Sequence, residues 1–172
     1  LMPNTTYVAL AYGLDGQTPN TKIFTKEFTT KSNVAGMSDI QLTWDNHYNL
    51  ADAAEADAAH WGNYAGWNDY ALVPVTISGV SANDDIYWTL TTLPIDYYNY
   101  DDEWIRDITS NENCHQSVHS FCYFQIPYEY EYSLIAVAKD ANGNFGKLFK
   151  KEIYLYASDS ADISSYVYKE VE

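Results

Sequence analysis

Two separated stretches of the chain share one pattern of apolar and polar positions. Tyr7–Thr30 and Tyr132–Leu155 align without a gap. Each stretch reads as an apolar run, a polar turn containing Gly, Asn and Asp, and a second run of mixed character, which is typical of a β-hairpin. The run that begins at Tyr132 is almost continuously apolar, so we expect it to be a central strand. The repeat therefore predicts two hairpins of one kind.

The identical positions of the repeat lie in both of its runs and in the turn between them. They are Tyr7/Tyr132, Ala11/Ala136, Asp15/Asp140, Lys22/Lys147, Phe24/Phe149, Lys26/Lys151 and Glu27/Glu152.

Between the hairpins, the apolar periodicity alternates between strand-like and helix-like segments. Ile40, Leu42 and Trp44 share one parity, which predicts a strand. Pro74 should confine its own strand to an edge or a bulge, because proline cannot donate to a ladder. The expected strands are residues 39–45, 70–80, 86–93, 118–126 and 128–138. The expected helices are residues 49–60, with Asn49 as the cap, and 101–110, which starts with acids.

The composition supports strands and narrows the range of partners. The chain has 17 Tyr, 5 Trp and 6 Phe, and aromatic side chains favour pleated surfaces. Its formal charge of −15 repels phosphate backbones and anionic membrane surfaces, so no nucleic acid is expected as a partner. No apolar run approaches the roughly 18 to 20 residues that cross a bilayer, and no direct membrane insertion of this segment is expected.

The first hairpin carries a further motif. Leu1, Pro3, Thr5 and Tyr7 stand at alternate positions, and Ala9, Ala11 and Gly13 follow. This motif resembles the sixth strand of a fibronectin type III domain, and Phe28-Thr29-Thr30 resembles the last strand of such a domain. Together with the Trp88-centred IYWTL, it is similar to tandem fibronectin-like repeats of surface lipoproteins of Bacteroides-type bacteria.

The resemblance implies an all-β fold, an Ig-like or fibronectin type III-like β-sandwich with one or two short helical insertions. It gives Tyr7 and Tyr132 a structural role, the tyrosine corner. Residues 1–31 would be the C-terminal hairpin of one such domain, 32–156 a second domain, and 157–172 an acidic tail in which residues 166–168 could dock as an added strand. The chain is then a portion of a longer protein, and the first hairpin is expected to pack against the second domain, since a lone hairpin is marginal in water.

Aromatic residues supply the first candidate site. Trp61, Tyr64, Trp67 and Tyr70 recur every third residue in a Gly/Asn-rich loop. They could stack on sugar rings, although buried aromatics that pin the loop are the more ordinary explanation.

Acidic residues supply the second candidate site. Asp101, Asp102 and Glu103 stand beside Tyr97, Tyr98, Tyr100 and Trp104, and paired carboxylates beside aromatics suit a glycoside hydrolase. A helix N-terminus also carries acids for its dipole alone, and we favour this interpretation.

Cysteine and histidine offer two further possibilities. Cys114 and Cys122 could form a disulfide or remain free thiols, and with His115 and His119 they could ligate zinc only if the stretch were helical. Asp140, Asn142 and Asn144 imitate the start of a calcium loop, but Phe145 stands where an EF-hand needs glycine, which favours a turn. No metal and no cofactor are expected.

No nucleophile motif or phosphate loop is present, so no catalytic residue is assigned and the chain is not expected to be an enzyme. The leading hypothesis is a non-catalytic adhesion, spacer or protein-binding module of a cell-surface lipoprotein, located extracellularly or in the periplasm. The alternatives are a carbohydrate-binding module that uses the aromatic loop and, third, a carboxylate glycoside hydrolase.

Overall fold

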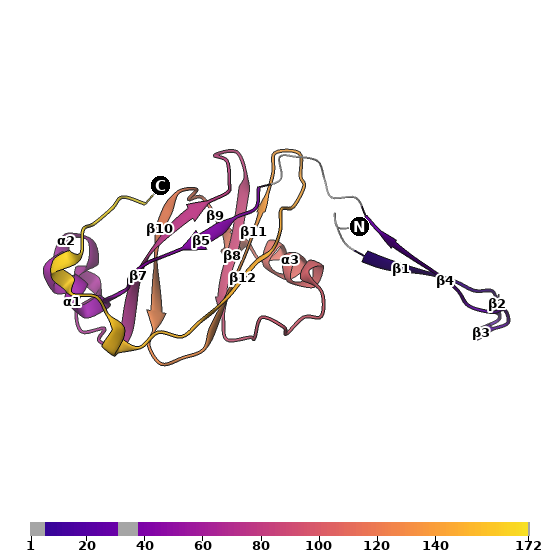
Figure 1. Cartoon of the computed structure of the whole chain (residues 1–172), viewed down its shortest axis with the longest axis horizontal. Coiled ribbons are helices and arrows are strands. Elements are labelled where there is room, and N and C mark those ends of the chain that lie inside the picture. The colour runs from indigo at the N-terminus through magenta and orange to yellow at the C-terminus, as the bar shows by residue number, and fades with distance from the viewer. Residues whose placement is uncertain (1–5, 31–37, 172) are drawn as a thin grey trace. The chain divides into compact units, whose positions relative to one another are not determined.

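The fold is that of a computed structural model, which describes residues 6–30 and 38–171. The chain divides into two compact units, Leu1–Met37 and Ser38–Glu172. Unit 1 is a β-hairpin and unit 2 is a two-sheet structure with short helices (Figure 1).

Unit 1 confirms the predicted first hairpin. Strand β1 (Thr6–Ala11) pairs antiparallel with β4 (Phe24–Thr29). The two-residue strands β2 (Leu14–Asp15) and β3 (Thr18–Pro19) pair next to the turn, where Gly16 adopts a φ of 64°. Tyr7 stacks on Phe28 across the ribbon, with ring centroids 5.8 Å apart.

Unit 2 contains two antiparallel sheets, with the order β10-β7-β5 in one, where β6 also pairs with β7, and β12-β11-β8-β9 in the other. The strands of the first sheet are β5 (Gln41–Thr43), β6 (Tyr48–Asn49), β7 (Tyr70–Ser78) and β10 (Phe121–Pro127). Those of the second are β8 (Asp85–Thr91), β9 (His115–Gln116), β11 (Tyr132–Lys139) and β12 (Phe149–Ile153). The expected all-β sandwich is therefore confirmed at the level of architecture.

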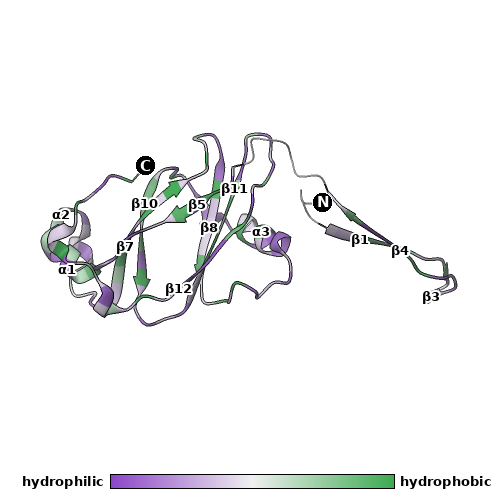
Figure 2. Ribbon diagram, in the orientation of Figure 1, coloured by the Kyte–Doolittle hydropathy of each residue, from purple (hydrophilic) through white to green (hydrophobic). Residues whose placement is uncertain are grey.

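The core lies between the two sheets, and the central strands β7 and β11 supply its middle. Val73, Val75 and Ile77 alternate along β7, while Leu134, Ala136 and Ala138 alternate along β11, and all six are buried in one cluster. Figure 2 shows apolar residues along β7, β10 and β11. Each fully buried Val, Leu or Ile side chain contributes roughly 1.5 to 3 kcal/mol, so this layer dominates the stability of unit 2.

Short helices cover the outer faces of the sheets. They are α1 (Leu50–Ala56), α2 (Ala58–Trp61) and α3 (Asp101–Ser110), with 3-10 turns η1 (Gly62–Tyr64), η2 (Glu112–Cys114), η3 (Ala157–Asp159) and η4 (Ile163–Ser165). The predicted cap of α1 is confirmed, because Asn49 Oδ1 accepts from the Ala51 N–H at 2.9 Å. Helix α1 packs on Leu72 of β7, and α3 lies against β8 and β11.

The second predicted hairpin, β11–β12, has the same strand register as β1–β4. Tyr7 faces Phe28 in the first hairpin and Tyr132 faces Ile153 in the second, which are aligned positions of the repeat. The correspondence continues along the ribbon to Ala11 opposite Phe24 and Ala136 opposite Phe149. The sequence repeat is therefore a repeat of strand pairing.

Pro74 was expected to confine its strand to an edge or a bulge, and the edge alternative is wrong. β7 is a central strand, paired with β10 on one side and with β5 and β6 on the other. β6 pairs with Leu72 and Ala71, and β5 pairs from Thr76 onward, so the ladder on that side is interrupted around Pro74. This gap explains how a central strand accommodates a residue without an N–H.

The tail also differs from expectation. Residues 166–168 do not form an added strand. Aromatic side chains hold it instead: Tyr166 meets Tyr48 at 5.3 Å between ring centroids, and Tyr168 stacks on His60 at 3.6 Å. Side-chain packing therefore replaces the backbone ladder that we predicted.

Gly79 and Gly146 both lie close to the backbone of the segment that leads into β5. The close approach of Gly79 generates a prediction. A Cβ on Gly79, which has a φ of 75°, would lie 2.1 Å from the backbone oxygen of Asp39. Gly79→Ala should therefore lower the free energy of unfolding by about 3 kcal/mol, through backbone strain and a clash that no side-chain movement relieves. Urea denaturation measures this loss.

Gly143→Ala is the matched control. Gly143 has a φ of 84° with nothing near its Cβ position, so only the backbone strain of about 1 kcal/mol applies. Equal losses for the two variants would contradict the proposed clash at Asp39.

Candidate functional site

The predicted aromatic loop forms a continuous row of contacting rings. Trp61 contacts Tyr64, Tyr64 contacts Trp67, and Trp67 contacts Tyr70. Exposure differs sharply along this row: Trp61 is 8% exposed, whereas Trp67 is 42% exposed. Among these four residues, Trp61 is therefore a packing residue, whereas Trp67 is accessible at the surface.

Trp61 is part of a packed aromatic layer between α2, β10 and the tail. Its indole N–H donates to the Tyr166 hydroxyl at 2.6 Å, and its ring meets Tyr123 edge-on at 4.9 Å. Burial raises the pKa of Tyr166 well above its ordinary range, so this hydroxyl stays protonated. Trp61 thus holds the tail in place and is not available for stacking on a ligand.

Tyr70, the last residue of the row, lines a groove of about 670 Å³. The groove lies where β7 begins, β10 ends and β11 begins, because Tyr70 is paired with Pro127 across the first sheet. Its lining residues are Asn68, Asp69, Tyr70, Pro127, Tyr128, Glu129, Tyr130, Tyr132 and Ala157. We call this surface the tyrosine groove.

The turn between β10 and β11 carries most of the groove. Tyr128 is buried and anchors the turn, since its hydroxyl lies 3.2 Å from the Tyr48 backbone oxygen and 2.7 Å from Ser160 Oγ. Glu129 has a φ of 61°, the one positive φ at a non-glycine residue in the described ranges 6–30 and 38–171. Its N–H donates to the Leu155 carbonyl at 2.9 Å, which holds this conformation and leaves Tyr130 62% exposed.

The tyrosine groove combines aromatic faces with hydrogen-bonding groups. Phenol rings offer apolar faces and hydroxyls, while Asn68, Asp69 and Glu129 offer amide and carboxylate oxygens. Such a mixture suits a ligand with alternating apolar and hydroxyl-bearing surfaces. Of the predicted aromatic set, Tyr70 alone lines this groove.

The turn residues of the groove were missed by the sequence reasoning. The signal that could have found them is the alternation of tyrosine and glutamate in Tyr128-Glu-Tyr-Glu-Tyr132. We interpreted that stretch as the start of a strand, but β11 begins only at Tyr132.

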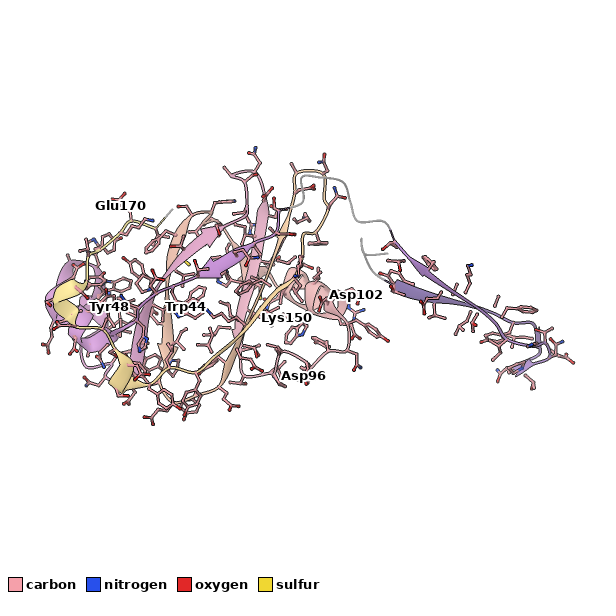
Figure 3. The ribbon with its side chains drawn as sticks, viewed as in Figure 1. Trp44, Tyr48, Asp96, Asp102, Lys150 and Glu170 are labelled. Carbon is pink, nitrogen blue, oxygen red and sulfur yellow. The ribbon has the colours of Figure 1, made fainter. Side chains whose placement is uncertain are left out.

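The predicted acidic cluster lies at the first turn of α3, whose bounds match the prediction. Asp101 makes an ion pair with Lys150 of β12 at 2.6 Å. Figure 3 labels Lys150 and Asp102, the neighbour of Asp101 in α3. Trp104 is buried and its indole N–H donates to the Ile95 backbone oxygen at 3.1 Å. Trp104 therefore anchors the helix, and the Asp101 carboxylate joins α3 to the sheet.

The tyrosine-corner role of Tyr7 and Tyr132 stays a prediction. Tyr132 is half-buried and packs against the core, which suits a structural residue.

The two cysteines are free thiols and lie in different elements. Cys114 ends η2 beside β9, whereas Cys122 is on β10 in the core, so the considered disulfide is not formed. The two histidines have separate partners. The His119 Nε2–H donates to the Asp84 backbone oxygen at 2.9 Å, and His115 lies 3.6 Å from the Asp85 carboxylate.

The Asp140 segment forms the predicted turn. Asp140 Oδ1 accepts from the N–H groups of Asn142 and Asn144, both at 2.9 Å. These bonds hold the pKa of Asp140 below its ordinary value. The carboxylate thus organises its own loop.

Within residues 6–30 and 38–171, no group of three or more His, Cys, Asp or Glu side chains could hold a metal ion. No helix in that part of the chain is both long enough and apolar enough to traverse a membrane.

Comparison with known proteins returns no match among protein-family models, curated proteins or solved structures.

Burial of Cys122 generates a prediction on thiol chemistry. Burial raises the pKa of this thiol from 9.0 to about 12, and the thiolate is the reactive form. At pH 8 its thiolate fraction is then lower by roughly a thousandfold, at ten per pKa unit. Alkylation by iodoacetamide at pH 8, followed by mass spectrometry, should leave Cys122 unmodified in the folded protein and modify it rapidly in urea. Equal rates in both conditions would contradict the buried, free thiol.

Proposed function

We propose that the chain is a non-catalytic adhesion or spacer module of a cell-surface protein built from tandem sandwiches of the Ig-like, fibronectin type III kind. The observation that carries this proposal is the shared register of the two hairpins. Tyr7 opposite Phe28 and Tyr132 opposite Ile153 occupy aligned positions of one repeat. Two hairpins built alike in one chain are what a tandem array of one domain type produces.

The arrangement of strands in unit 2 supports the same proposal. The described part of unit 2 has eight strands in two sheets, and two of them, β6 and β9, are only two residues long. In chain order β11 and β12 are the last two strands, the places that the resemblance assigns to the hairpin. Two antiparallel sheets, with β10 returning beside β7, suit an Ig-like Greek-key sandwich.

The proposed location is the cell surface, where an outer-membrane lipoprotein would carry the module. The periplasm is the alternative location. The formal charge of −15 supports a surface role, since it keeps the module soluble and away from anionic membranes. Its partners would be proteins or glycans at the cell surface.

Surface labelling tests the proposed function. Antibodies raised against residues 38–171 should label intact cells of the source organism, and external protease should remove the label. An antibody against a cytoplasmic protein is the control. Labelling that appears only after the cells are permeabilised would contradict a surface module.

Glycan recognition is the second candidate function, and the tyrosine groove favours it. Tyr70, Tyr130 and Tyr132 place aromatic rings beside the carboxylates of Asp69 and Glu129 in one groove. Aromatic faces stack on sugar rings, and the oxygens accept hydrogen bonds from sugar hydroxyls.

A glycan array tests this second candidate. Tyr130→Ala should reduce binding of any captured glycan at least about tenfold, because an exposed ring contributes its stacking and little to folding. Tyr100→Ala, which removes a similarly exposed ring at the start of α3, should leave binding unchanged. Capture that survives Tyr130→Ala would rule out the tyrosine groove.

A further inference from the structure

A second pocket, separate from the tyrosine groove, lies toward the end of the sheet β12-β11-β8-β9. Its volume is about 440 Å³. The pocket is built by the segment that follows β8, the start of β11 and the end of β12. Its lining residues are Thr92, Leu93, Pro94, Glu131, Tyr132, Ser133, Glu152, Ile153 and Tyr154. We call this surface the glutamate pocket.

The strand register places a hydroxyl and a carboxylate of the pocket side by side. Ser133 lies directly opposite Glu152 in the β11–β12 ladder. Their neighbours Leu134 and Ile153 belong to the core between the sheets, so Ser133 and Glu152 point to the outer face. Directly opposite residues have Cβ atoms about 4.5 to 5.5 Å apart, which lets both side chains contact one ligand group.

Ser133 is a buried polar residue whose hydroxyl is left for a ligand. It is 3% exposed, and its side chain forms no hydrogen bond with another residue of the described ranges 6–30 and 38–171. In those ranges no side-chain oxygen is both closed off and unpaired, so the Ser133 hydroxyl reaches the pocket that it lines. A buried hydroxyl without a partner is costly, and a ligand with N–H donors would remove that cost.

The carboxylates of Glu131 and Glu152 make the pocket negative. Among the described residues, neither glutamate has an ion-pair partner. The two lysines that precede Glu152 are engaged elsewhere, since Lys150 pairs with Asp101 and the Lys151 ammonium lies over the Trp44 ring. The pocket therefore presents uncompensated negative charge to a ligand.

Aromatic and apolar side chains complete the glutamate pocket. Tyr154 is 43% exposed and Tyr132 is half-buried, while Leu93 and Pro94 add apolar surface. Desolvation and neighbouring charges, including that of Glu131, raise the pKa of Tyr154, so this carboxylate lies near the phenol ring. An aromatic face beside carboxylates attracts cations.

We propose that the glutamate pocket binds an arginine side chain of a partner protein. A guanidinium carries five N–H donors in one plane, which the carboxylates and the Ser133 hydroxyl accept. It is more weakly hydrated than an ammonium and stacks on aromatic rings such as that of Tyr154. Its methylene stem would lie along Leu93 and Pro94. This inference goes beyond the proposed function, because it holds wherever the protein is located.

Nuclear magnetic resonance on the whole 172-residue chain tests the proposal. N-acetyl-L-arginine amide is titrated into the isotope-labelled protein, and the backbone amide signals are followed. The expected result is a saturable shift centred on Ser133 and Glu152. The citrulline derivative has the same shape without the charge and should give no saturable shift, and the lysine derivative should bind at least about threefold more weakly.

A matched pair of variants locates the binding. Glu152→Gln removes one carboxylate of the pocket and should weaken arginine binding at least about threefold. Glu55→Gln removes the same charge from an exposed position on α1 and should leave binding unchanged. Ser133→Ala should weaken binding about threefold through the lost hydroxyl, with thermal unfolding as the check that the fold is intact.

Three outcomes would overturn the proposal. The first is the absence of a saturable shift at Ser133 and Glu152. The second is equal binding of the arginine and lysine or citrulline derivatives, which would remove the guanidinium as the recognised group. The third is an equal loss for Glu152→Gln and Glu55→Gln, which would assign the binding to the net charge of the chain. The surface-labelling result has no bearing on these readouts, so the two proposals fail separately.

Discussion

The packing of β7 against β11 is the constraint on which unit 2 depends. Both strands are central in their sheets and are buried on the face that points to the other sheet. Each also has buried residues of the opposite parity, Leu72 on β7 and Ile135 on β11. A strand buried on both faces needs a covering element beyond the sheet, since apolar side chains would otherwise meet water. The positions of α1 and α3 follow from this requirement.

The same requirement explains how the tyrosine groove is held. Its turn connects β10 to β11 and therefore crosses from one sheet to the other at the end of the core. Tyr128 fills that end from inside, which leaves the neighbouring Glu129 and Tyr130 outside. A rigid core that ends in an anchored turn is the usual way in which a sandwich presents side chains at its rim. The tyrosine groove thus forms where the chain passes from one sheet to the other, and the alternating tyrosine and glutamate residues of that turn set its chemistry.

The sequence predicted those parts of the fold in which local pattern and burial agree. Helix α3 and strand β8 were predicted because their apolar periodicity is unambiguous, and the two hairpins because the repeat is gapless. The central place of β7 could not be predicted, since the gap between β5 and β6 that accommodates Pro74 arises only from pairing between distant segments. The way in which the tail docks could not be predicted for a similar reason, because the hydrogen bond from Trp61 to Tyr166 joins residues 105 positions apart. For the candidate site, the aromatic spacing found Tyr70 but could not separate it from the buried Trp61.

The aligned lysines of the two hairpins, Lys26 and Lys151, lie in different surroundings. Lys151 shares the parity of Leu134 and Phe149, which is the core face of β12, yet its ammonium lies 3.6 Å from the centroid of the Trp44 ring. Burial lowers the pKa of Lys151, and the aromatic face partly offsets the cost of desolvating the charge. Lys26 is the identical residue of the first hairpin, between Phe24 and Phe28 on the equivalent face. Lys26 lies on an exposed strand, where its ammonium is hydrated, whereas the ammonium of Lys151 needs the Trp44 ring because its strand packs on the core.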